Sequence, residues 1–307
     1  MFVINPDKFL MPTYRISPFR TDDIGKNLYL TNTSAIGNYL QDRFNGLNYI
    51  YTQNGRQAIN IALRHYCLSD EDVVTIFTTS GNFYISSCIT NEIEKFCKWS
   101  REILPETKVL FVNHEFGYPF PDIQELKLLN LPIIEDCAGS FFSEDNEYPI
   151  GKIGDFAVYS FPKMFPIQVG GLLVASAQIR EIYIKKLPSE SLIYIKRVLS
   201  NQIQERDRII SQRLSNYKEL GWRFQTLGLN ERFVLEDGVV PSVFMFRTDN
   251  QNLDLPELKQ YFWAHGIQSS VFYGEEAFFI PVHQALTEAD LDYFFEVMRS
   301  FIQNRVK

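Results

Sequence analysis

Short apolar segments alternate with amphipathic helical segments through most of the chain, and this alternation constrains the fold most. The continuously apolar runs 73–77 (VVTIF), 107–114 (TKVLFVNH) and 131–136 (LPIIED) predict buried strands. The predicted helices lie between or beside them, at 56–68, 85–104 and 122–130. Helices between buried strands are typical of βαβ units, so we predict an α/β fold with a mostly parallel central sheet and helices on both faces.

The second half of the chain predicts a smaller α/β lobe. Two strands, 155–161 (DFAVYSF) and 170–176 (GGLLVAS), are joined by a loop with two prolines, and a charged helical stretch follows from about Ser189 to Leu220. The last 70 or so residues again alternate strand and helix, and Thr287 to Asp290 fit a capping box. We therefore predict a large domain at 1–185, with an N-terminal extension at 1–48, and a small domain at 186–307.

Charge and composition exclude several classes of protein. The 307 residues include 30 Lys and Arg against 37 Asp and Glu, a net charge of −7, and no basic run, which argues against nucleic acid as a partner. No stretch approaches the roughly 18 apolar residues of a membrane helix, and the N-terminus does not resemble a signal peptide. Four separated cysteines without a CxxC pair suggest neither a metal site nor disulfides. We expect a cytoplasmic protein with reduced thiols and no metal.

Three separate features could form one site. Asn54 and Gly55 precede an amphipathic helix, where they either bind a phosphate or simply cap the helix. Asp136 ends an apolar strand, where it either faces a ligand or caps the next turn. Lys163 lies in the loop between two strands, three residues after Ser160, and a loop lysine is commonly solvated. Each feature alone is ambiguous.

Their order along the chain resembles fold type I pyridoxal-phosphate enzymes, and more narrowly the DegT/StrS-type sugar aminotransferases. The strand ending in Glu-Asp before small residues and the segment GDFAVYSFPKMFPIQVGG are both similar to family motifs. Further similar segments are QNGRQAINIAL at 53–63, HGIQSSVFYG at 265–274 and IPVHQALTEADLDYFFEVM at 280–298. The resemblance covers roughly Tyr49 to Gln303.

The resemblance implies roles for individual residues around pyridoxal 5'-phosphate. Lys163 would form the Schiff base and carry the proton, and Asp136 would pair with the pyridinium nitrogen. The remaining implied residues are Asn54, Gly55, Arg56 and Ser160 at the phosphate, Phe83 or Tyr84 on the cofactor ring, and His114 and Tyr273 at the substrate. The sequence leaves the choice between Phe83 and Tyr84 open.

The implied function is amino transfer from an amino acid, glutamate by expectation, to a keto sugar linked to a nucleotide, within polysaccharide biosynthesis. The family also implies a homodimer. Two departures stand out: Gly139 replaces the usual Gln or His, and the segment 187–202 stands where the family carries a loop that reaches the partner subunit. We therefore expect a shortened, divergent member. The alternatives are a sugar lyase or dehydratase, and a relative without catalytic activity that acts as a partner subunit. Lys163 argues against the dehydratase.

Overall fold

The computed structural model describes residues 13–144, 150–179, 187–249 and 252–305. The chain forms two compact units. The larger consists of Phe19–Arg206 with Asp237–Val239, and the smaller of Met1–Pro18, Asp207–Glu236 and Val240–Lys307. No helix in the described ranges is long and apolar enough to span a membrane.

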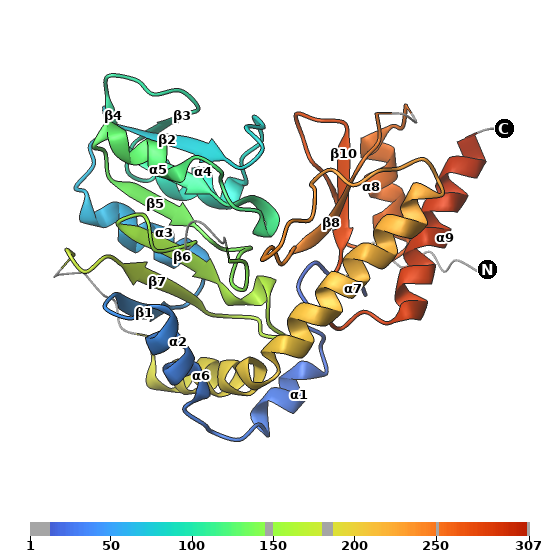
Figure 1. Cartoon of the computed structure of the whole chain (residues 1–307), viewed down its shortest axis with the longest axis horizontal. Helices are drawn as coiled ribbons and strands as arrows, with labels where there is room; N and C mark the ends of the chain where they lie inside the picture. The colour runs from blue at the N-terminus through green and yellow to red at the C-terminus, as the bar shows by residue number, and fades with distance from the viewer. Residues whose placement is uncertain (1–12, 145–149, 180–186, 250–251, 306–307) are drawn as a thin grey trace. The chain divides into compact units, whose positions relative to one another are not determined.

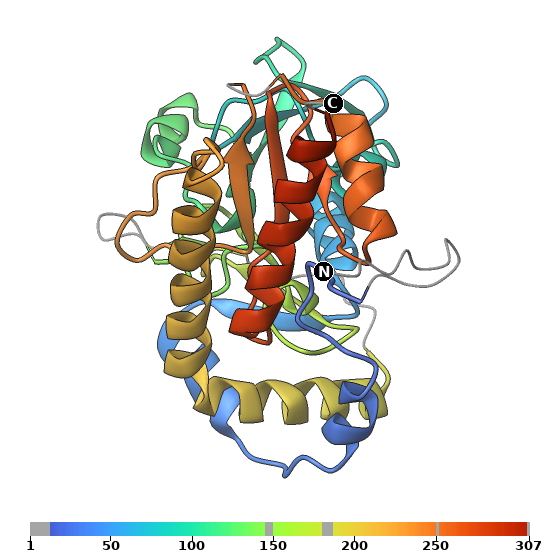
Figure 2. The ribbon, with the colours of Figure 1, turned by 90° about the vertical axis from the view of Figure 1, so that its right-hand side faces the viewer.

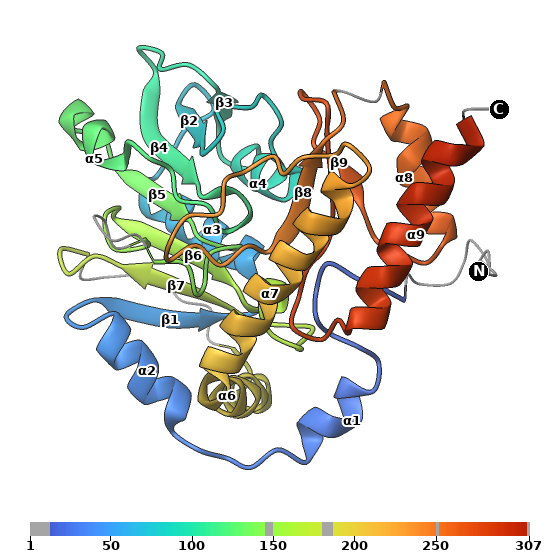
Figure 3. The ribbon, with the colours of Figure 1, turned by 45° about the vertical axis from the view of Figure 1, so that its right-hand side comes forward.

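The larger unit contains a seven-stranded sheet in the order β1-β7-β6-β5-β4-β2-β3, which can be followed in Figures 1 and 3. Only β7 is antiparallel to its neighbours, so the other six strands run in one direction. The predicted mostly parallel α/β sheet is confirmed. The strands are β1 (Asn48–Thr52), β2 (Val73–Thr78), β3 (Lys98–Ser100), β4 (Thr107–Asn113), β5 (Ile133–Asp136), β6 (Phe156–Ser160) and β7 (Gly171–Ala175).

Helices cover both faces of this sheet. Successive side chains of a strand point to opposite faces, and the strands carry apolar side chains on both. On one face, Ile134, Val158 and Leu173 pack with buried residues of α3 (Gly55–His65) and α4 (Ser87–Ile93). On the other face, Leu110, Val112 and Ile133 pack against α5 (Ile123–Leu126). Short 3-10 helices lie at η1 (Glu115–Gly117), η2 (Lys127–Leu129) and η3 (Phe161–Lys163).

The helix predicted at 85–104 is wrong in its second half. The helix α4 ends at Ile93, and Lys98–Ser100 forms the edge strand β3, paired in parallel with Val73–Thr75 of β2. The opposite side of the sheet also holds a strand without a prediction, β1, whose five residues pair with β7. Both segments are short, and pairing with a neighbouring strand fixes their conformation.

The charged helical stretch forms two helices, α6 (Ser189–Gln204) and α7 (Arg206–Gln225). The first of them belongs to the larger unit, which also holds α1 (Asp23–Leu28) and α2 (Ala35–Arg43). Ser200 Oγ donates to the Thr33 carbonyl and accepts from the Ile36 N–H, tying α6 to the start of α2. The units therefore divide after Arg206 rather than at 185, and residues 13–18 join the smaller unit.

The smaller unit combines an antiparallel sheet with three helices. Its sheet has the order β8-β10-β9, formed by β8 (Val243–Arg247), β10 (Ala277–Pro281) and β9 (Ser270–Val271). The helices are α7, α8 (Leu255–Ala264) and α9 (Glu288–Arg305), and Figure 2 shows α8 and α9, orange and red, beside each other. The predicted capping box is present, because Asp290 Oδ2 accepts from the Thr287 N–H at 2.8 Å and Thr287 Oγ1 from the Asp290 N–H at 3.4 Å.

Candidate active site

Three predicted site features follow the carboxyl ends of parallel strands. Asp136 ends β5, Ser160 ends β6, and Asn54 lies two residues beyond the end of β1. Because β1, β5 and β6 run in the same direction, these residues lie at one edge of the sheet. Open α/β sheets bind ligands at this edge.

The start of α3 and the end of β6 lie against each other. Asn54 Oδ1 accepts from the Gln57 N–H at 2.9 Å and so caps α3. A Cβ atom on Gly55 would lie 3.2 Å from Ser160 Cβ and 3.7 Å from Ser160 Oγ, so only glycine permits this approach without displacement. The N–H groups of Gly55 and Arg56, in the first helical turn, have no intrahelical acceptor. Together with the Ser160 hydroxyl and exposed Arg56, they form a cradle suited to a phosphate.

The Asp136 carboxylate is buried, with 6% of the residue exposed, and lies on the α3 side of the sheet with Ile134. Its Oδ1 atom accepts from the Ala138 N–H at 2.9 Å. In the part of the chain that the structure describes, no group donates to Oδ2. A nearly buried carboxylate with one open oxygen is suited to a cationic N–H donor.

Lys163 ends η3, and its side chain is exposed. The loop that carries it is tied to the end of β1, because the Gly170 N–H donates to the Gln53 carbonyl at 2.6 Å. The next residue, Gly171, has no room for a side chain: a Cβ atom there would lie 2.7 Å from both Thr52 Oγ1 and the Tyr159 carbonyl oxygen. The lysine loop and the phosphate cradle are therefore held in one framework.

The loop after β2 carries both aromatic candidates. Phe83 is 75% exposed, whereas Tyr84 is half-buried and its N–H donates to Asn82 Oδ1 at 3.4 Å. Two charged residues, Glu115 and Arg101, form hydrogen bonds to this loop. Glu115, which is 3% exposed, accepts from the Ser80 N–H at 2.7 Å and the Ser80 hydroxyl at 2.6 Å.

Arg101 holds the same loop by a second set of contacts. Its guanidinium donates to the Ile76 carbonyl at 2.6 Å, Thr78 Oγ1 at 3.0 Å and the Asn82 carbonyl at 2.8 Å. These contacts of Arg101 could not be predicted from the sequence, because two of the three acceptors are backbone carbonyls, which every residue has.

Replacing Arg101 by methionine should loosen this loop. The substitution keeps the apolar stem and removes three hydrogen bonds, so we expect a cost of about 2 kcal/mol and faster amide exchange at residues 79–84. Hydrogen exchange with mass spectrometry would measure it. Arg64→Met removes another guanidinium from the same unit, bonded to Asn60, and should leave the loop unchanged. Equal exchange in both variants would contradict the clamp.

Glu135, on the opposite face from Asp136, is completely buried and fully hydrogen-bonded. Its Oε2 atom accepts from the Gly151 N–H at 2.8 Å and from His114 Nε2 at 3.0 Å. Its Oε1 atom accepts from the N–H groups of Ile153 and Gly154 at 2.8 and 2.7 Å. Burial alone would raise the pKa of Glu135, but the bonds from His114, Gly154 and Gly151 lower it below its ordinary value.

His114 is 3% exposed, and both of its ring nitrogens are engaged. Nδ1 accepts from the Phe120 N–H at 3.0 Å, which leaves Nε2 as the N–H that donates to Glu135. The predicted substrate residue therefore offers no open ring nitrogen here and instead orients Glu135. Cys137 Sγ lies close to both side chains, but the lone pairs of His114 and Glu135 already accept N–H groups, so this trio is not an open set of metal ligands.

Tyr273, the other predicted substrate residue, belongs to the smaller unit. It is 45% exposed, and Lys259 Nζ lies 5.8 Å from the centroid of its ring. Its role toward a substrate stays a prediction.

The seven-stranded sheet with one antiparallel member has the fold of pyridoxal-phosphate-dependent aminotransferases. The aminotransferase TlmJ from Streptoalloteichus hindustanus superposes with a TM-score of 0.72 at 15% identity, over 93% of this chain and 95% of that one. The pyridoxal-phosphate form of the putative sugar aminotransferase Spr1654 from Streptococcus pneumoniae gives 0.71 at 15% identity, over 99% of each chain.

The sequence comparison matches part of the chain to one family. Residues 96–189 match the DegT/DnrJ/EryC1/StrS aminotransferase family, which confirms the resemblance. The GDP-perosamine synthase of Escherichia coli O157:H7 is 27% identical over 168 residues, covering 47% of this chain and 46% of that protein. The match therefore spans less than half of the length of this curated relative.

Proposed function

We propose that the protein is a pyridoxal-phosphate-dependent aminotransferase that moves an amino group from an amino acid to a keto sugar. The observation that carries the proposal is the Asp136 carboxylate, buried with one oxygen open at the edge where the Gly55–Ser160 contact and Lys163 also lie. Family and fold comparisons support the same reaction class.

The residues present fit the cofactor. The first N–H groups of α3, the Ser160 hydroxyl and Arg56 would hold its phosphate, because each is a donor or a cation at the cradle. Asp136 would keep the ring nitrogen protonated through Oδ2, and Tyr84 or Phe83 would stack on the ring.

Bound pyridoxal phosphate supplies an electron sink for breaking a bond at the carbon that bears the amino group. The chain supplies the remaining functions. The Lys163 amine would attach the cofactor covalently and then carry the proton at the reacting carbon. Asp136 would hold the proton on the ring nitrogen. The anchoring of its strand through Glu135 limits movement of that carboxylate.

For the acceptor we propose a nucleotide-linked keto sugar, with glutamate as the amino donor. The name of the curated relative, GDP-perosamine synthase, supports an acceptor of this class. We further propose a homodimer that acts in the cytoplasm in polysaccharide biosynthesis, as the family resemblance implies.

Asp136→Asn tests the central residue. Asparagine keeps the size but cannot hold a proton on the ring nitrogen, so amino transfer from glutamate should fall by about 10²- to 10⁴-fold. Cofactor absorbance with added pyridoxal phosphate would report binding, and its change on adding glutamate would report the half-reaction. Asp122→Asn alters an exposed carboxylate of the same unit and should match the wild type. If the wild type bound no cofactor, the relative without catalytic activity would be the better account.

A further inference from the structure

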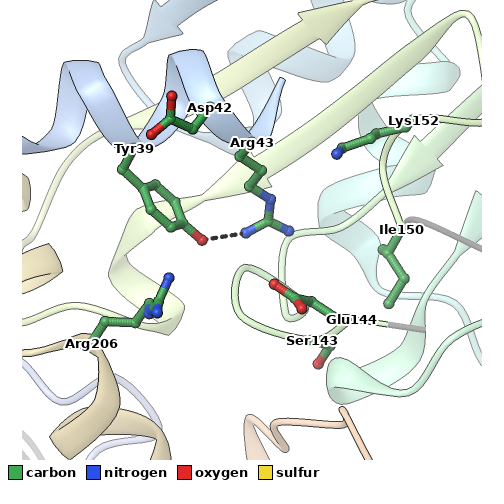
Figure 4. Close-up of a pocket in the computed structure, with 8 residues that line it drawn as sticks. All are labelled: Tyr39, Asp42, Arg43, Ser143, Glu144, Ile150, Lys152 and Arg206. Atoms are coloured by element: carbon green, nitrogen blue, oxygen red, sulfur yellow. Dashed lines mark hydrogen bonds between the residues drawn. The ribbon is translucent and has the colours of Figure 1, made fainter. Parts of the chain in front are cut away.

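A pocket of about 410 Å³ lies on the larger unit (Figure 4). Its lining residues are Tyr39, Asp42, Arg43, Ser143, Glu144, Ile150, Lys152 and Arg206. None of them belongs to the proposed cofactor set. Arg43 lies over Tyr159, whose side chain points to the face opposite that of Val158 and the phosphate cradle. The pocket is therefore a separate site.

Arg43 is fixed in position at this pocket. Its guanidinium donates to the Tyr39 hydroxyl at 2.9 Å and to the Phe141 carbonyl. The guanidinium carbon also lies 5.2 Å from the ring centroid of Phe141, 5.6 Å from that of Tyr159 and 5.3 Å from that of Phe44. Hydrogen bonds and aromatic contacts thus hold the cation before any ligand arrives, which reduces the entropy cost of binding.

This cation has no carboxylate within ion-pair distance among the described residues, although it is half-buried. Lys152 likewise lacks an ion pair there. Figure 4 shows Tyr39 between Arg43 and Arg206, and Lys152 extending toward Arg43 from the other side. A partly buried guanidinium is best stabilised by an anion, and an anion in this pocket would meet three cationic side chains.

The geometry points to a binding site for a sugar phosphate or a related phosphate ester, and we propose this ligand class for the pocket. The phosphate would lie on Arg43, with Lys152 and Arg206 beside it. The Asp42 and Glu144 carboxylates, both exposed and without an ion pair in the described ranges, would accept hydroxyl groups of the sugar. The volume lies within the range of small-molecule sites.

Calorimetric titration of the full chain with glucose 1-phosphate and with inorganic phosphate tests the site. The protein is first loaded with pyridoxal phosphate and then freed of excess cofactor, so that the cradle at Gly55 and Ser160 is filled and the pocket stays open to the probe. We expect both probes to bind the wild type, more weakly as salt rises, and Lys152→Gln to weaken both by about five- to tenfold. Lys127→Gln removes an exposed cation outside the pocket and should bind like the wild type.

Glu144→Gln separates the hydroxyl contacts from the phosphate contacts. The substitution should weaken the binding of glucose 1-phosphate by about fivefold. The affinity for inorganic phosphate should stay unchanged or rise slightly. Absence of binding, or equal affinities in Lys152→Gln and Lys127→Gln, would overturn the site. An unchanged affinity of Glu144→Gln for glucose 1-phosphate would overturn the assignment of a sugar. A failure of the proposed function would instead appear as the absence of absorbance from bound pyridoxal phosphate. The titrations of Lys152→Gln, Lys127→Gln and Glu144→Gln would still test the pocket in that case.

Discussion

Lys163→Ala should abolish amino transfer from glutamate, by about 1,000-fold or more, while the protein stays folded. The side chain is exposed on η3, so its removal should change the free energy of unfolding by no more than about 0.5 kcal/mol. Activity should be lost because the substitution removes the amine that we propose attaches the cofactor and carries the proton. Borohydride reduction followed by peptide mapping would measure the attachment, with the cofactor mass on the Lys163 peptide in the wild type alone.

Two matched variants sharpen this test. Lys163→Arg keeps the positive charge but has no nucleophilic amine, so it should be as inactive as the alanine variant. Lys108→Ala removes an exposed lysine from β4 and should retain full activity. Cofactor mass on another lysine, or activity in Lys163→Arg, would exclude the proposed role.

Glu135→Gln should lower the free energy of unfolding by about 3–5 kcal/mol. The carboxylate accepts four hydrogen bonds at a site without solvent exposure, and an amide turns an N–H group toward backbone donors that need an acceptor. Urea denaturation would measure the loss. Glu125→Gln, at an exposed position in α5, is the control and should change stability little.

The same carboxylate predicts a dependence on pH. Its pKa in the folded protein lies below the ordinary value of 4.5, so its contribution to stability is complete above about pH 4.5. That contribution is lost as the pH falls through the lowered pKa. The wild type should therefore lose more stability than Glu135→Gln below pH 4.5, and parallel pH profiles for the two proteins would contradict the assignment.

Residues with strong local patterns were predictable. The continuously apolar runs of β2, β4 and β5 were recognisable as buried strands from the sequence. The carboxylate at the end of the last run indicated that Asp136 lies at the ligand edge of the sheet. The helix start at Asn54 was equally clear, because a capping residue precedes a regular apolar face. These features depend on neighbours in the sequence.

Features that depend on distant partners were not predictable. The charged periodicity runs through Glu205 without a break, yet α6 ends at Gln204, and the bond that ties α6 to the segment before α2 through Ser200 joins residues far apart in the sequence. The sequence drew attention to Glu135 but could not identify its partners, which are backbone groups of residues 151–154. His114 was interpreted as a substrate residue because it follows a strand at the ligand edge, and its bond to Glu135 could not be predicted because Glu135 belongs to another strand.

The hydrogen bonds of Glu135 allow the pocket residues to change in sequence without displacing the proposed cofactor residues. They fasten the start of β6 directly to the end of β5, since the N–H groups of Gly151 and Gly154 bind the residue next to Asp136. Substitutions of pocket residues such as Asp42 and Glu144 would leave that attachment intact. The chain can thus acquire a new ligand preference on one face of the sheet while the proposed cofactor residues on the other keep their positions.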